Sequence, residues 1–169
     1  TNVGAYSNAS VTIGVPGIGD IKFNQGGSGT GIQRMDDMTP TVWEEADGAG
    51  QSAGINKISG GAAGATIEVT PSGLPDGLAG VFAYTADADG GSSINDKSVG
   101  GDSAYAGSGW DITLTATEDL HGVAGLTIYG GISEVDQNTH YSTVNGNKDE
   151  SVMGIKYAMG SFTAGYQQS

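Results

Sequence analysis

The stretch WDITLTAT, Trp110 to Thr117, decides the fold class because its residues alternate in polarity without a break. The apolar set is Trp110, Ile112, Leu114 and Ala116, and the polar set is Asp111, Thr113, Thr115 and Thr117. A period of two is typical of a β-strand, in which successive side chains point to opposite faces. This stretch is therefore predicted to be a strand with one apolar face and one polar face.

The same alternation recurs on both sides of this stretch, whereas helical periodicity is nearly absent. The other segments are ASVTIGV (9–15), GDIKFN (19–24), ATIEVT (65–70), LAGVFAYTA (78–86), LTIYGGI (126–132), SVMGIKYA (151–158) and SFTAGYQQ (161–168). The chain is therefore predicted to be all-β with about eight strands. Alternation alone fits two architectures: a soluble sandwich with its apolar faces inside, or a transmembrane barrel with those faces toward lipid.

The connections between the predicted strands alternate between short and long. The short ones are PGIG, PSGLPDG, EDLHGVAG and MGS, and the long ones span 25–64, 87–108 and 133–149. An antiparallel meander places all the long loops at one end and all the short turns at the other, as in outer-membrane barrels. Aromatic residues toward strand ends match the interfacial girdles of such barrels. These residues are Tyr84, Trp110, Tyr157 and Tyr166.

The composition excludes several classes of function. The net charge is −13, from 19 acidic and six basic residues, which argues against a nucleic-acid partner. The absence of cysteine excludes disulfides, thiolate metal sites and a cysteine nucleophile. No run of 18 apolar residues is present to form a spanning helix. No catalytic motif is recognisable, so the chain is not expected to be an enzyme.

Negative charge is concentrated in RMDDMTPTVWEEADGAG, Arg34 to Gly50. The acidic residues there are Asp36, Asp37, Glu44, Glu45 and Asp47. Thr41 and Glu44 form a capping box, which predicts a short helix. Two interpretations remain open: the acids line a constriction that attracts cations, or they keep an external loop solvated.

Asp87 and Asp89, in ADADGG (86–91), are candidates for binding Ca²⁺ because close-spaced aspartates and glycine suit that ion. The full EF-hand loop pattern is missing. Loose binding of Ca²⁺ by acidic loops is therefore expected rather than a defined site, and no other cofactor is predicted.

Three segments together resemble the general bacterial porins of the alphaproteobacterial type. They are GDIKFNQGGSGTGIQRMDDMTPTVWEE (19–45), GWDITLTAT with GLTIYGGIS (109–117 and 125–133), and ESVMGIKYAMGSFTAGYQQS (150–169). The resemblance covers most of the chain and is weakest over 87–108. It implies a barrel of about sixteen strands, of which this chain would be an internal piece of roughly half. A closed eight-stranded barrel is the rival, but its interior has no room for a folded-in loop of this length.

The resemblance also implies how the segment 25–64 functions. That segment would fold into the barrel as a constriction loop, opposite basic, inward-facing wall residues. The predicted wall residues are Lys22 and Lys156, with Glu68 and Asp111 adding negative charge. The expected protein is a weakly cation-selective channel for small hydrophilic solutes and ions, a homotrimer in outer-membrane lipid. The alternative is a soluble or surface-attached adhesive β protein that binds Ca²⁺.

Overall fold

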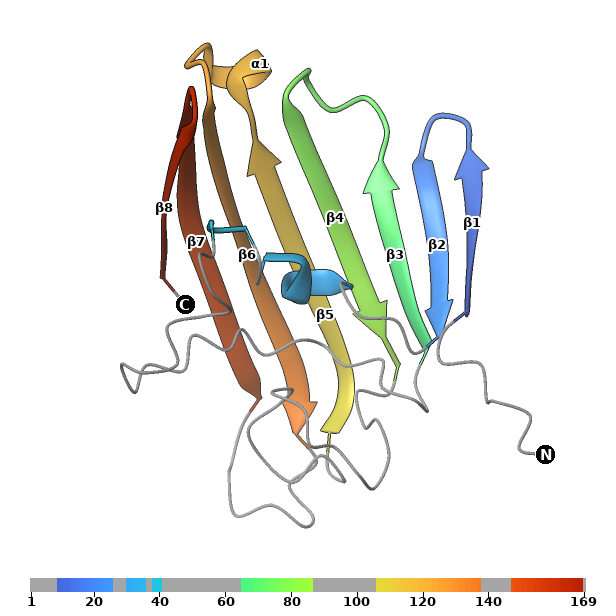
Figure 1. Cartoon of the computed structure of the whole chain (residues 1–169). Helices are drawn as coiled ribbons and strands as arrows, with labels where there is room; N and C mark the ends of the chain where they lie inside the picture. Colours follow the sequence, from blue (N-terminus) through green and yellow to red (C-terminus); the bar gives the residue numbers. More distant parts are fainter. Residues whose placement is uncertain are drawn as a thin grey trace, which may run out of the picture.

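The computed structural model describes residues 9–25, 30–35, 38–40, 65–86, 106–137 and 147–168. Their eight strands form one sheet, hydrogen-bonded in the order of the chain, with every neighbouring pair antiparallel (Figure 1). The strands are β1 Ala9–Val15, β2 Gly19–Gln25, β3 Ala65–Pro71, β4 Leu78–Thr85, β5 Ala106–Ala116, β6 Leu126–Gln137, β7 Lys148–Met159 and β8 Phe162–Gln168. The predicted all-β class and the meander are confirmed.

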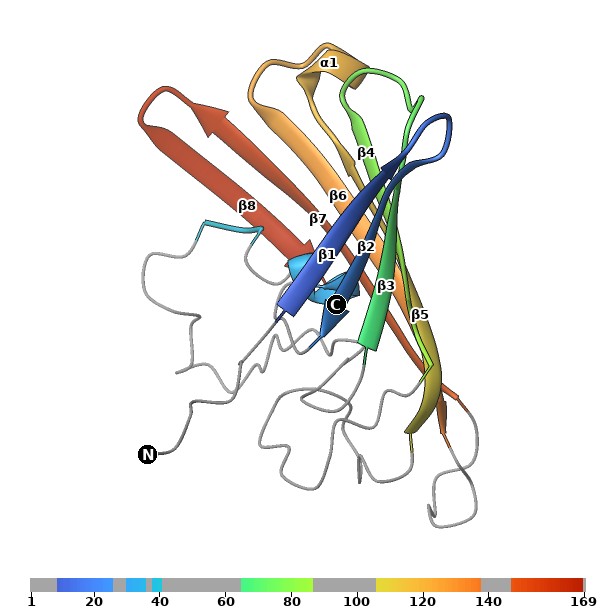
Figure 2. The same cartoon turned by 90° about the vertical axis from the view of Figure 1, so that its right-hand side faces the viewer.

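Within the described residues the sheet is open, because β1 and β8 each pair on one side only. Figure 2 shows that the sheet is curved, with η1 on its hollow side. The structure therefore shows the antiparallel sheet of the prediction but not a closed barrel.

The short turns all lie at one end of the sheet, as the connection lengths predict (Figure 1). One of these turns contains α1, Glu118–His121, which ends at Gly122 in the left-handed conformation. The sequence did not predict this single helical turn. The predicted limits of two long connections were too wide. In 133–149, β6 runs on to Gln137 and β7 begins at Lys148, and in 87–108, β5 already begins at Ala106.

The two faces of the sheet differ in what covers them. The 3₁₀ helix η1, Gly31–Met35, lies against β4, β5 and β6 on the hollow side (Figure 2). We call this the inner face, and its strand residues include Glu68, Asp111 and Thr113, all buried. The opposite, outer face carries the large apolar side chains. Its members include Val11, Ile13, Phe23, Ile67, Phe82, Ile112, Leu114, Ile128, Ile132, Met153 and Ile155, all exposed.

The polarity of the sheet is thus inverted relative to a soluble domain, in which the apolar face is the buried one. Leu114 is 49% exposed and Ile155 is 48% exposed, whereas their polar neighbour Asp111 is fully buried. Within the described ranges, neither helix is long and apolar enough to cross a membrane.

Candidate functional site at the inner face

The candidate site consists of residues 30–35 and 38–40, which we call the segment 30–40 and which lie on the inner face, together with the wall beneath them. This segment follows β2 and belongs to the predicted loop 25–64. Its η1 helix contacts β4, β5 and β6. Further on, Thr39 and Pro40 lie over Gly165 of β8, where an added Cβ would stand 2.7 Å from Pro40 Cδ. The segment therefore crosses the wall from β4 to β8, held against it rather than projecting away from it.

An apolar plug anchors the segment. Ile32 is fully buried and Met35 is 2% exposed, and both pack against Tyr129 of β6 and Val152 of β7, with Met38 partly buried beside them. These side chains form one buried apolar cluster around η1. Full burial of such a side chain contributes about 1.5–3 kcal/mol, so the plug is the main apolar contribution to docking.

Two buried carboxylates hold the start of η1. The Gly31 N–H donates to Glu68 Oε1 at 2.9 Å, and the Ile32 N–H donates to Asp111 Oδ2 at 2.6 Å. The first N–H groups of a helix have no partner within the helix and need acceptors from elsewhere. Glu68 and Asp111 therefore act as acceptors that fix η1 to β3 and β5.

Two cations share the carboxylate of Glu68. The Arg34 guanidinium forms an ion pair with Glu68 through Nη2 and donates from Nε to the Gly31 carbonyl oxygen at 3.0 Å. Lys22 Nζ stands 3.9 Å from Glu68 Oε2 on the other side. The side chains of Lys22 and Arg34 are 39% and 28% exposed, so their outer parts reach solvent while the carboxylate does not. The accessible charge at this point of the wall is positive.

The four predicted wall residues all lie on the inner face. Lys22 and Glu68 are opposite each other in the register of β2 and β3, and Asp111 lies beneath η1. Lys156 is half-buried and is opposite Gly165 on β8. However, Glu68 is 4% exposed and Asp111 is fully buried. These two acids accept hydrogen bonds from η1 and are shielded from solvent, whereas the sequence predicted that they would add negative charge to the pore wall.

The predicted constriction acids lie outside the described residues. They are Asp36, Asp37, Glu44, Glu45 and Asp47. The capping box at Thr41 and Glu44 and the Ca²⁺ candidates Asp87 and Asp89 also lie outside them. Among the residues that the structure does describe, no group of three or more acidic or histidine side chains is arranged to hold a metal ion.

Sequence reasoning missed the residues that dock the segment: Ile32, Arg34, Met35 and Tyr129. A signal for some of them was present, since Ile32, Met35 and Met38 recur every three residues in an otherwise polar stretch. That spacing places apolar side chains on one side of a 3₁₀ helix. The acceptors could not be found in this way, because Glu68 and Asp111 stand 37 and 79 residues from their donors.

Comparison of the chain with family models, with curated proteins and with solved structures finds no match. The function is therefore inferred from three features of the molecule itself. These are the bare apolar outer face, the polar inner face, and the segment 30–40 that crosses the inner face.

Proposed function

We propose that the chain forms part of the wall of a porin-like outer-membrane β-barrel, a channel through which small hydrophilic solutes and ions diffuse passively. One observation carries this proposal: the sheet exposes its apolar face and lays a connecting segment across its polar face. In a transmembrane barrel the apolar face meets lipid and the polar face lines a water-filled lumen. A soluble sheet with these faces would expose a large apolar patch to water, which soluble proteins avoid.

Closure of the barrel follows from the same reasoning. The backbone groups on the free edges of β1 and β8 need partners, because an unpaired strand edge is not tolerated in lipid. In this proposal further strands pair with both edges and complete a barrel of about sixteen strands. A barrel of eight strands has an interior that side chains fill, whereas here η1 and Pro40 occupy the hollow side. A homotrimer remains what the porin resemblance implies.

The segment 30–40 narrows the lumen in this proposal. The plug of Ile32 and Met35 holds η1 against the wall. In this proposal the acids that follow in the sequence, from Asp36 to Asp47, line the narrowed passage. Carboxylates at a narrow aqueous passage concentrate cations and exclude anions. The exposed parts of Lys22 and Arg34 and the half-buried Lys156 supply positive charge on the wall. The expected selectivity is for cations, and it is weak because both signs are present.

Selectivity of single channels tests this proposal. The pair Glu44→Gln and Glu45→Gln should move the reversal potential in a salt gradient across a planar bilayer toward zero, because two constriction charges are lost. The control pair, Asp76→Asn and Asp119→Asn, removes the same charge from exposed positions in the turns. It should leave the reversal potential unchanged. An equal shift from both pairs would contradict the inward loop, and a protein that never conducts would end the channel proposal in favour of the soluble alternative.

A further inference from the structure

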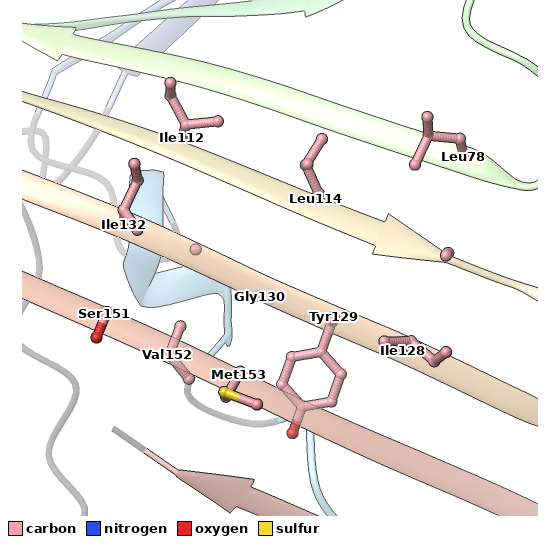
Figure 3. A pocket seen from close by; sticks show the side chains of 12 residues that line it. Leu78, Ile112, Leu114, Ile128, Tyr129, Gly130, Ile132, Ser151, Val152 and Met153 are labelled. Atoms are coloured by element: carbon pink, nitrogen blue, oxygen red, sulfur yellow. The ribbon is translucent and has the colours of Figure 1, made fainter.

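A groove of about 620 Å³ runs along the outer face between β4 and β7. Its apolar lining includes Leu78, Ile112, Leu114, Ile128, Ile132 and Met153. Figure 3 shows these side chains on the near side of the sheet, with η1 behind it. The groove therefore opens on the face opposite the candidate site, and Tyr129 and Val152, which pack against η1, also border it.

Small residues between large ones form the groove. In the register of the sheet, Leu114 and Met153 stand on either side of Gly130, and Ala116 is opposite Ile128. A Cβ at Gly130 would stand 3.0 Å from the Val152 carbonyl oxygen, a tight contact that favours glycine at this position. Gly130 and Ala116 thus form the bottom of the groove, and the larger side chains of its lining, such as Leu114 and Met153, form its sides. A flexible hydrocarbon chain fills such a surface better than a second rigid surface does.

Charge at the two ends of the groove limits what binds there. At the end nearer the long connections the lining finishes at Ser151, and the next outward pair in the register is Glu134 opposite Asp149. At the turn end, α1 places Glu118 and Asp119 just after the groove residue Ala116. Both ends are therefore acidic.

The described basic side chains are elsewhere. Lys22, Arg34 and Lys156 belong to the inner face or to η1. Lys148 precedes Asp149 on β7, at a register position opposite the buried inner-face residue Val135. An anionic headgroup at either end of the groove would meet carboxylates without a compensating cation from these residues, whereas an ammonium group would be attracted to them.

We propose that the groove binds an acyl chain of a membrane lipid and prefers a lipid whose headgroup carries an ammonium group to one that is purely anionic. The apolar lining takes the hydrocarbon chain, and Glu134 with Asp149 attracts the ammonium group. This inference rests on the proposed function, because it requires the outer face to contact lipid.

Trp110 provides the probe for this site. It lies on β5 two residues before the groove residue Ile112, and it is opposite Glu134 in the register. The chain contains two tryptophans, so a Trp43→Phe background leaves Trp110 as the sole fluorophore of that kind. The protein is reconstituted in vesicles that contain phosphatidylethanolamine or phosphatidylglycerol with brominated acyl chains, which quench nearby tryptophan. The apparent affinity of the quenching lipid should be about 1.5- to 5-fold higher for the ethanolamine lipid, the range expected of an exposed ion pair.

Two sets of variants identify the groove as the cause. Ala116→Phe fills it and should reduce quenching by both lipids. Ala164→Phe places the same side chain on the outer face of β8, outside the groove, and should leave quenching unchanged. Glu134→Gln with Asp149→Asn should abolish the preference between the lipids while quenching itself persists.

The outcomes separate this inference from the proposed function. If neither brominated lipid quenches Trp110, the outer face does not contact lipid and both proposals fail. If both lipids quench equally, or if Ala116→Phe changes nothing, the outer face contacts lipid but the inference about the groove is wrong. A preference for phosphatidylglycerol would likewise overturn the inference alone.

Discussion

Gly31 is the residue on which the docking of η1 depends most directly. Its φ is +55°, a backbone conformation that residues other than glycine rarely adopt. An added Cβ would also overlap the Asp111 carboxylate that accepts the hydrogen bond from the Ile32 N–H. Conformational freedom and close approach are thus both required at one position. No residue with a side chain meets both requirements without displacing η1 from the wall.

We therefore expect Gly31→Ala to destabilise the protein more than a matched glycine substitution does. Gly17 has a φ of +79° but nothing within 4 Å of the place that a Cβ would take, so Gly17→Ala measures the backbone cost alone, about 1–2 kcal/mol. Gly31→Ala should cost roughly 1–3 kcal/mol more, because a buried backbone N–H loses its carboxyl acceptor. Denaturant-induced unfolding measures both, and equal losses would show that Gly31 does not hold η1 to the wall.

At the scale of elements, Tyr129 joins three strands on the inner face. Its ring lies across Gly154 of β7, and its hydroxyl donates to Gln167 Oε1 on β8 at 2.6 Å. Because Gly154 is opposite both Tyr129 and Gln167 in the register, the ring crosses β7 where no side chain obstructs it. The same ring forms part of the socket for Ile32 and Met35.

Tyr129→Phe should keep the socket and lose the link to β8. We expect a decrease of about 0.5–1.5 kcal/mol in the free energy of unfolding, the usual net contribution of one hydrogen bond. Tyr166→Phe is the control, since Tyr166 is exposed on the outer face. Hydrogen exchange of the β8 amides should accelerate in Tyr129→Phe only. Identical behaviour of the two variants would rule out the hydroxyl as a link between strands.

The strands were predictable from the sequence and the helices were not, for a physical reason. Alternation as in Trp110–Thr117 is a local property of the chain, so it locates strands and their faces. By contrast, η1 is held by Glu68, Asp111, Tyr129 and Val152, all distant in sequence. Alternation also does not show whether the polar or the apolar face of the sheet is covered by other parts of the chain. The interpretation of the candidate site depends on which of the two faces is covered.

At the scale of the whole molecule, the proposed function requires the outer face to lie in lipid. Leu114→Arg then places a charge in the apolar band and should cost about 2–4 kcal/mol near the bilayer midplane. Thr163→Arg, at an exposed inner-face position, should cost little because that face is wet. The measurement is the folding free energy into lipid vesicles. Similar costs at the two sites would mean that the faces do not differ in environment.

Labelling of single cysteines shows directly which face meets lipid, and the chain suits this experiment because it has no cysteine of its own. Two pairs of exposed neighbours suit this test: Thr12 and Ile13 of β1, and Thr163 and Ala164 of β8. In each pair the threonine belongs to the inner face and the residue after it to the outer face. Each is replaced singly by cysteine and treated, in lipid vesicles, with a water-soluble thiol reagent. A porin-like wall predicts labelling at positions 12 and 163 and protection at 13 and 164. Equal labelling within both pairs would show that water bathes both faces, and the channel proposal would be wrong.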